Sequence, residues 1–284
     1  MRRNSRPHAG YVLVLTLGVI ALAAITLAGL ARYSLQLATR AQDATQELQH
    51  RWGLFSTRYM LLDRAAEILE AQVDDEDAGI PPWPKPNQLS ATYLLGTHEF
   101  RVRIADEDSK VNLNTIYVRK RDKLLPAIHQ LGREAGMMRV RLLPQADVRK
   151  PFTSWGQVFD LSVLPPSERS TGEQLGEAAQ QMTCWGSGQL NIRRASDAAL
   201  RQVAELALPA GHVSELVDLR KHWGGQQVNE LLAELELRRP QLLAVSRLLS
   251  TESRSYSLSV DVRRGARNDS YLYVCDGKTV CFAW

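Results

Sequence analysis

This 284-residue chain contains two runs of acidic residues, whose carboxylates are the side chains best suited to bind a metal ion. Residues 74–77 (Asp-Asp-Glu-Asp) form one run, and Asp106, Glu107 and Asp108 form the other. Several carboxylate oxygens from one loop are the ligands that Ca²⁺ prefers, but neither run has the spacing of an EF-hand loop. We interpret the first run as a solvated loop, and we expect Asp106 to hold turn backbone. Calcium remains possible as a cofactor, but no metal site can be assigned to particular residues.

Motifs of known enzyme classes are absent from the sequence. It contains no G-x-S-x-G elbow, no H-E-x-x-H, no phosphate-binding P-loop and no G-x-G-x-x-G. The pair His98-Glu99 has no second histidine four residues later, and the six histidines are scattered. We therefore expect no catalytic residues, and nothing in the sequence favours an enzyme.

Three cysteines define a further candidate site. Cys275 and Cys281 flank an Asp-Gly turn signal, which predicts a terminal hairpin that carries both residues. A disulfide between them and a pair of free thiols are both compatible with this pattern in an oxidising compartment. We expect Cys184 to be a small buried residue, and no spacing resembles a zinc site.

A long apolar segment near the N-terminus determines how these residues are positioned. Residues 11–31 carry no charge before Arg32, and as a helix they span about 30 Å, the thickness of a bilayer core. The segment is too long for a secretory signal peptide, so we expect it to be retained as a single-pass anchor. The N-terminal arginines favour a cytoplasmic N-terminus; they are Arg2, Arg3 and Arg6.

The helix is predicted to continue beyond the membrane as one helix over 11–73. Large apolar residues recur at spacings of four and three, which predicts one stripe packed on a globular domain. The stripe consists of Leu48, Trp52, Phe55, Tyr59, Leu62, Ala66 and Leu69. Gly53 is the one weak helix former in this stretch, and the proline-rich residues 80–88 end any helix.

The rest of the chain reads as strands at both ends of a helical segment. Apolar residues alternate over 97–108 and again over 253–264, which predicts half-buried strands. We therefore expect an α+β fold with a linker and first strands over 74–114, a helical inserted subdomain over 115–250, and returning strands over 251–284. The alternating positions are Phe100, Val102 and Ile104 in the first segment, and Tyr256, Leu258, Val260 and Val262 in the second.

Two features of the helical segment bear on nucleic-acid binding. Residues 188–221 resemble a helix-hairpin-helix unit, with Ser196 as an N-cap, but the hairpin has one glycine, Gly211. The basic cluster at 119–123 is interrupted by Asp122, and the net charge of the chain is only +4. We interpret the hairpin as a packing element and the cluster as a solvated face, so nucleic acid is an unlikely partner.

Four sequence segments together resemble the minor pseudopilins of the general secretion pathway protein K family in type II secretion systems. They are the Gly10-Tyr11 junction before the apolar helix, "VRIADEDSKVNLN" at 102–114, "GQLNIRRASDAAL" at 188–200 and "LSTESRSYSLSVDV" at 249–262. The motif residues are Asp106, Lys110, Asn112, Asn114 and Asn191. This family tends to read Asn-x-Asn-Thr-Ala where the present chain reads Asn-Ile-Arg-Arg-Ala from Asn191, a departure that concerns the local turn.

The resemblance implies a type IV pilin-like fold, in which a long N-terminal helix packs on a small antiparallel sheet with a large, mostly helical inserted subdomain. It implies that residues 1–10 are a leader that a prepilin peptidase cleaves after Gly10, and that the new N-terminus at Tyr11 is methylated. It also implies a single-pass inner-membrane protein with a periplasmic C-terminal domain. The implied partners are the other minor pseudopilins at the filament tip and the major pseudopilin. The calcium-binding carboxylates of some family members cannot be matched to residues of this chain.

Leu15 bears on the place of the subunit in such a filament. Pilin-like subunits usually carry Glu at the fifth mature position, where it pairs with a neighbouring N-terminal amine, and here that position is Leu15. A charge inside a bilayer costs at least about 2.5 kcal/mol unless it is paired. A subunit at the very tip has no neighbour above it to supply the amine, so Leu15 is consistent with a protein that caps the filament.

Three functions remain open from the sequence. The first is a non-catalytic minor pseudopilin that caps the tip of the pseudopilus and helps to initiate its assembly for protein export. The second is a minor pilin of a type IV pilus or DNA-uptake machine, in which the hairpin at 188–221 would contact DNA. The third is a membrane-tethered periplasmic enzyme, whose active site would have to lie outside every motif considered above.

Overall fold

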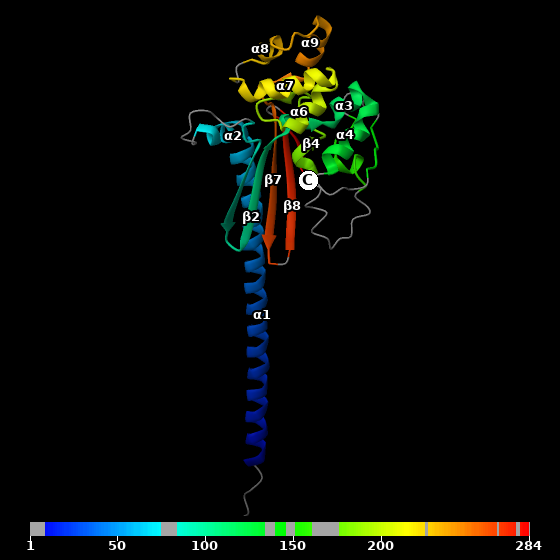
Figure 1. The fold of residues 1–284 in the computed structure, drawn as a ribbon. Coiled ribbons are helices and arrows are strands. Elements are labelled where there is room, and N and C mark those ends of the chain that lie inside the picture. Colours follow the sequence, from blue (N-terminus) through cyan, green and yellow to red (C-terminus); the bar gives the residue numbers. More distant parts are fainter. Residues whose placement is uncertain are drawn as a thin grey trace, which may run out of the picture.

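A single long helix dominates the computed structural model, which describes residues 9–74, 84–133, 140–145, 151–160, 176–224, 227–265, 267–276 and 279–283. Helix α1 (Ala9–Thr57) projects far below the globular part of the chain (Figure 1). Its apolar N-terminal part has no buried residues, and by length and composition it is able to cross a membrane. The described chain therefore contains one candidate membrane anchor, at the position that the sequence predicts.

The helix predicted over 11–73 is interrupted. Helix α1 ends at Thr57, a short π-helical turn η1 (Arg58–Leu62) follows, and α2 (Ala65–Asp74) leaves the axis of α1 (Figure 1). A π-helical turn accommodates an extra residue, so it rotates the following residues around the helix. Leu62, Ala65 and Leu69 consequently lie against the sheet, where they are buried.

The predicted packing stripe is wrong for its first half and for Ala66, which is exposed. The side chains of Leu48, Trp52, Phe55 and Tyr59 are 56–67% exposed. The buried face of α1 instead contains Gly53 and Thr57. A Cβ atom on Gly53 would lie 2.2 Å from Cζ of Phe100, so only glycine lets the helix approach the sheet this closely. Gly53, which the sequence identifies as a weak helix former, is thus a point of close contact between α1 and the sheet.

A five-stranded antiparallel sheet packs against the outer half of α1, in the order β1-β2-β7-β8-β9. The strands are β1 (Gln88–Leu95), β2 (His98–Asp106), β7 (Ser255–Arg264), β8 (Arg267–Asp276) and β9 (Thr279–Ala283). In the central pair, Val102 lies opposite Val260 and Ile104 opposite Leu258. The alternation predicted from the sequence is confirmed in both strands, because Phe100, Val102, Ile104, Leu258, Val260 and Val262 are all buried.

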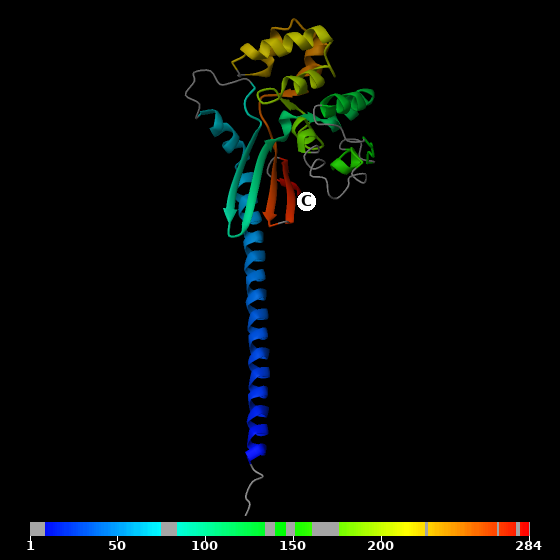
Figure 2. The same cartoon turned by 60° about the horizontal axis from the view of Figure 1, so that its bottom comes forward.

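The segment between β2 and β7 forms a second, mostly helical body with its own core. Figures 1 and 2 place most of its helices at the end of the sheet that lies away from the free part of α1. Its helices are α3 (Leu113–Arg119), α4 (Arg121–Arg133), α6 (Asp197–Ala204), α7 (Ala210–His222), α8 (Val228–Ala233) and α9 (Arg239–Ser246), with 3-10 turns η2 (Glu107–Ser109) and η3 (Trp155–Gln157). Residues 176–181 are also helical. The α+β fold with a large helical insertion is thus present.

Two short parallel strand pairs lie within this body, next in sequence to its junctions with β2 and β7. One pair joins β3 (Val111–Asn112) to β4 (Met182–Thr183), and the other joins β5 (Leu190–Asn191) to β6 (Leu249–Ser250). The helical core begins at Val111 and includes Val274 of β8. The two bodies therefore share a boundary that is itself packed.

The helical hairpin expected at 188–221 consists of α6 and α7. Ser196 is the N-cap of α6, as predicted, since its hydroxyl accepts a hydrogen bond from the amide of Ala199 at 3.1 Å. Leu206 and Leu208, in the turn between the helices, are buried in the helical core. The apolar residues of the turn therefore face inward and hold the hairpin in place.

Candidate functional site

The motif residues of the sequence meet in one buried polar cluster. It lies where β2 ends and the chain enters the helical body, and it continues through η2 and β3 to the first turn of α3. Asp106, Glu107, Asp108, Lys110, Asn112, Asn114 and Asn191 are all at most 9% exposed. Burial of so many polar groups is tolerated only when each has hydrogen-bond partners, which makes the partners informative.

Asp106 closes the turn and joins three segments. Its Oδ1 accepts hydrogen bonds from the amides of Asp108 and Ser109, at 2.9 and 3.2 Å, which confirms the predicted role in holding turn backbone. Its Oδ2 accepts from the hydroxyl of Ser253 at 2.5 Å and from Nδ2 of Asn191 at 3.3 Å. Burial raises the pKa of Asp106 to about 7, against the effect of these donors.

Glu107 faces the sheet and β4. Its Oε1 accepts hydrogen bonds from Nζ of Lys110 and from the hydroxyl of Ser257 in β7, both at 2.5 Å. Its Oε2 accepts a short hydrogen bond from the hydroxyl of Thr183. Since Glu107 and Lys110 are both almost fully buried, this ion pair is shielded from water. Both carboxylate oxygens of Glu107 accept hydrogen bonds.

Asp108 points to a third part of the fold. Its Oδ1 accepts from the amide and the hydroxyl of Ser187, at 2.7 and 2.9 Å. Its Oδ2 accepts from the amides of Arg254 and Ser255, at 2.8 and 3.1 Å. Burial raises the pKa of Asp108, while these four donors favour its ionised form. The three adjacent carboxylates thus diverge, and each joins a different pair of segments.

The asparagines of the motif fix the start of the helical body. Asn112 caps α3 by accepting from the amide of Thr115 at 3.1 Å, and its Nδ2 donates to the carbonyl of Trp185 at 2.5 Å. Asn114 exchanges hydrogen bonds with the backbone of Phe152, at 2.8 Å in each direction, and donates to the carbonyl of Cys184 at 2.7 Å. These side chains replace backbone pairing between segments that are distant in sequence.

Arg194 extends the cluster to the N-terminal helix. Its Nη2 donates to Oε1 of Glu70 in α2 at 2.7 Å, its Nη1 donates to the carbonyl of Pro86, and its Nε lies 3.8 Å from Oδ2 of Asp106. Arg194 is one of the two arginines at which the chain departs from the family pattern, so the sequence did mark this position. Its partners, and the roles of Ser253, Ser187 and Thr183, were missed because they are distant in sequence.

The chemistry of the cluster is that of a structural junction. The oxygens of all three carboxylates accept hydrogen bonds from the protein, so none is directed at an open space. Within the described ranges, no group of three His, Cys, Asp or Glu side chains is arranged to hold a metal ion. The other acidic run has only Asp74, the last residue of α2, among the described residues.

Neither a protein-family model nor a curated protein matches the chain. Among solved structures, it is similar to a chain in the crystal structure of the GspK-GspI-GspJ complex from the enterotoxigenic Escherichia coli type 2 secretion system. The likeness covers 86% of this chain and 98% of that chain, at 14% sequence identity and a TM-score of 0.45. A likeness of this degree carries no functional argument, which must come from the residues of the chain itself.

Helix α1 provides a second candidate site, an exposed apolar seam. Continuing the wrongly assigned stripe toward the membrane segment at spacings of four and three gives only apolar side chains, all of them exposed. We define the apolar seam as Leu37, Ala41, Ala44, Leu48, Trp52, Phe55 and Tyr59. Its aromatic rings contact one another, with centroids 6.2 Å apart for Trp52 and Phe55 and 6.0 Å apart for Phe55 and Tyr59.

The other predicted site residues lie at the two ends of the chain. Residues 1–8 of the leader are outside the described residues, while Gly10 and Tyr11 are in the first turns of α1 and Leu15 is exposed on it. Cys275 is buried in β8, which pairs with β9, where Cys281 lies. The side chain of Cys281 is outside the described part, so a Cys275–Cys281 bridge remains a prediction. Processing after Gly10 also remains a prediction. Cys184 is buried as expected, and burial raises the pKa of its thiol.

Proposed function

We propose that this chain is a non-catalytic minor pseudopilin of a type II secretion system, which caps the tip of the pseudopilus and helps to initiate its assembly. The observation that carries the proposal is the apolar seam of α1. In the proposed topology, the inner half of α1 is the inner-membrane anchor, the N-terminus is cytoplasmic and the globular part is periplasmic. The resemblance of the motif segments to the protein K family supports the same role.

The seam requires a partner outside the membrane. Trp52, Phe55 and Tyr59 are 59%, 61% and 67% exposed, on the side of α1 that does not face the sheet. Contiguous apolar patches of this kind on a protein surface mark interaction sites. The seam follows the same line as the apolar membrane segment, so a second long apolar helix can lie along both without a change of angle. Other minor pseudopilins and the major pseudopilin supply helices of that kind.

Processing and position belong to the same proposal. A membrane prepilin peptidase cleaves after Gly10, and Tyr11 becomes the methylated N-terminus. Because residue 15 is Leu, the membrane segment contains no acidic side chain that would need a partner amine. This composition suits a subunit with no neighbour above it. The buried polar cluster has a supporting task, because it holds the helical body, the sheet and α2 in one arrangement.

Co-expression with candidate pseudopilins tests the proposal. The full chain should co-purify with other minor pseudopilins, and replacing the three exposed aromatic residues (Trp52→Ser, Phe55→Ser, Tyr59→Ser) should weaken that association by about 100-fold or more. The matched control is Leu243→Ser, which removes a side chain that is 51% exposed in α9, away from the seam. Mass spectrometry should find a methylated Tyr11 at the mature N-terminus, and Gly10→Ala should abolish both processing and co-purification.

Three results would contradict the proposal. Unchanged co-purification of the triple variant would remove the seam as the assembly surface. An unchanged N-terminus and unchanged partners in Gly10→Ala would remove the pilin-like processing. Salt-dependent DNA binding by the purified chain, without association with pseudopilins, would instead favour a pilus or DNA-uptake machine.

A further inference from the structure

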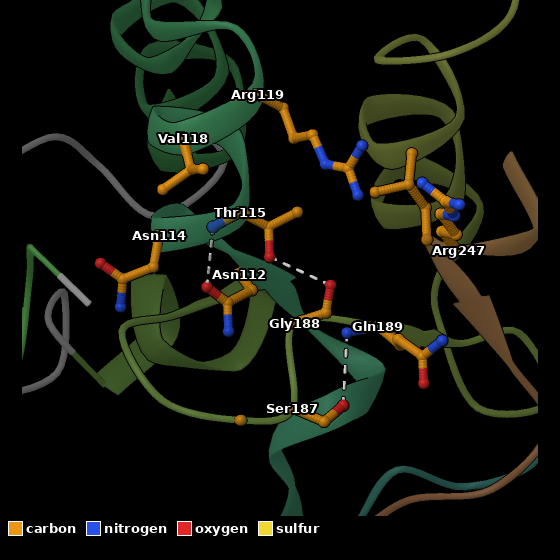
Figure 3. Close-up of a pocket in the computed structure, with 11 residues that line it drawn as sticks. Asn112, Asn114, Thr115, Val118, Arg119, Ser187, Gly188, Gln189 and Arg247 are labelled. Atoms are coloured by element: carbon orange, nitrogen blue, oxygen red, sulfur yellow. Dashed lines mark hydrogen bonds between the residues drawn. The ribbon is translucent and has the colours of Figure 1, made fainter. Parts of the chain in front are cut away.

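A pocket of about 280 Å³ lies beside the buried polar cluster, on the surface of the helical body. Its walls come from α3 and its N-cap residue, from the glycine-bearing loop at 186–189, and from the residues that follow α9 (Figure 3). Among the described residues that line it there are two arginines, Arg119 and Arg247, and no acidic residue. The pocket is thus positively charged.

The two arginines lie at the C-terminal ends of two helices. Arg119 is the last residue of α3 and Arg247 directly follows α9, and both side chains are exposed. Figure 3 shows Arg119 extending from α3 toward Arg247 across the pocket. Neither guanidinium makes a hydrogen bond or ion pair with the part of the chain that the structure describes. By contrast, nearby Lys123 pairs with Glu205 at 3.4 Å.

Helix ends explain the presence of the arginines but not their convergence. A cation at the C-terminal end of a helix is favoured by the helix dipole, which accounts for a basic residue at each position. Two like charges that are directed toward the same space repel each other, and an anion between them would reverse the sign of that interaction. A negatively charged ligand between the two side chains would therefore be attracted by both.

The wall opposite the arginines is held by hydrogen bonds and close contacts to the polar cluster and α3. Gly186 and Gly188 have φ values of +101° and +84°. A Cβ on Gly186 would lie 2.8 Å from Oδ1 of Asp108, and one on Gly188 would lie 3.0 Å from Oγ1 of Thr115. Thr115 also donates a hydrogen bond to the carbonyl of Gly188 at 3.0 Å. Because this loop is already ordered, binding would cost little beyond the ordering of two arginine side chains.

We propose that this pocket binds a carboxylate carried by an acidic segment of another protein. Planar guanidinium groups match carboxylates with two parallel hydrogen bonds, and the side-chain amide of Gln189 adds a neutral donor at the pocket wall. Val118, which is 52% exposed, lines the same pocket and offers apolar contact to the carbon atoms of a peptide, which a free inorganic anion lacks. This site is separate from the apolar seam and does not depend on the proposed assembly role.

Titration of the full chain in detergent micelles with two matched peptides tests the proposal. The probes are acetyl-Leu-Glu-Glu-Leu-amide and its uncharged counterpart acetyl-Leu-Gln-Gln-Leu-amide, and the readout is the Nε–Hε NMR resonances of isotope-labelled arginine. The acidic peptide should shift the two resonances that are lost in Arg119→Gln and Arg247→Gln. Each single variant should weaken binding by about 5-fold and the double variant by about 20-fold or more.

Two further variants separate the pocket from a general charge effect. Arg239→Gln removes an exposed arginine at the start of α9 that has no partner among the described residues, and it should leave binding unchanged. Arg247→Lys keeps the charge but loses the planar fork, so its affinity should fall between that of the parent chain and that of Arg247→Gln. Unchanged urea midpoints will show that all five variants are folded.

Three outcomes would overturn the proposal. The first is an equal response to the acidic and uncharged peptides. The second is a double variant that binds as tightly as Arg239→Gln. The third is binding of inorganic phosphate that the acidic peptide does not displace, which would make this a site for a small inorganic anion.

Discussion

Replacing Gly53 by alanine tests how α1 is held on the sheet. The new Cβ would lie 2.2 Å from Cζ and 2.7 Å from Cε1 of Phe100, well inside any permitted contact. The Phe100 ring is fully buried and stacked on Tyr93, with centroids 5.0 Å apart and the planes 3° from parallel. The Tyr93 hydroxyl is in turn hydrogen-bonded to Thr57 of α1. The ring cannot move away without disturbing these contacts.

The size of the effect follows from two opposing contributions. Overpacking a well-packed core costs about 1–3 kcal/mol. Alanine is favoured over glycine in a helix interior by about 1 kcal/mol, which opposes that cost. We therefore expect Gly53→Ala to lower the free energy of unfolding by about 1 kcal/mol. Gly211→Ala is the matched control, because no described atom lies within 4 Å of its Cβ position in α7, and it should be neutral or stabilising.

Urea unfolding of the full chain in a non-denaturing detergent, followed by tryptophan fluorescence, measures both variants. The decisive comparison adds Phe100→Leu, alone and combined with Gly53→Ala. The smaller side chain makes room for the new methyl group. The double variant should therefore lose about 1 kcal/mol less unfolding free energy than the sum of the losses in the two single variants. The reasoning is refuted if Gly53→Ala is as stable as the parent chain, or if the two changes are simply additive.

Three further predictions concern the polar cluster and the helix–sheet contact. Asp108→Asn turns an amide donor toward groups that donate, so urea unfolding should give a loss of about 2 kcal/mol, against less than about 0.5 kcal/mol for exposed Asp218→Asn. Arg194→Gln leaves Asp106 buried without its cation and should cost about 3 kcal/mol in the same assay; an unchanged midpoint would show that Arg194 does not support the cluster. Burial, and the charge of neighbouring His50, lower the pKa of His98, so the neutral ring is favoured in the fold. The neutral His98 ring therefore stabilises the fold above about pH 6.5, and this stabilisation is lost as the pH falls below that value. In thermal unfolding between about pH 7 and 5, the His98→Phe variant should lack this loss.

Local patterns predicted the strands well, and the helix face poorly. In β2 and β7 the alternation of Phe100, Val102, Val260 and Val262 with polar residues states which side is buried, because a strand has only two faces. On α1 the largest apolar side chains were assigned to the core, yet the sheet takes the face with Gly53. The size of an apolar side chain predicts its burial only when the helix has one apolar face. Helix α1 has two such faces: one packs on its own sheet, and the other remains exposed.

The polar cluster was predictable only where its partners are close in sequence. The cap made by Asp106 spans three residues, so turn chemistry alone indicated it. The hydrogen bonds from Asp106 to Ser253 and from Arg194 to Glu70 join segments that are far apart in the chain. No local pattern encodes such pairs, and the sequence could mark only their positions, through the motif at 102–114 and the departure at Arg194.

The central strand pair also constrains the order in which the chain can fold. β2 lies beside β7, and the whole helical body lies between them in sequence. The β1–β2 hairpin and the helices form from nearby residues, whereas pairing of β2 with β7 closes a loop that contains the whole helical body and is therefore slower. During synthesis, β2 therefore waits with one edge open and with Phe100, Val102 and Ile104 uncovered by β7. A chain that stops before Ser255 keeps that edge, and open apolar edges are what drive strands of separate molecules to pair.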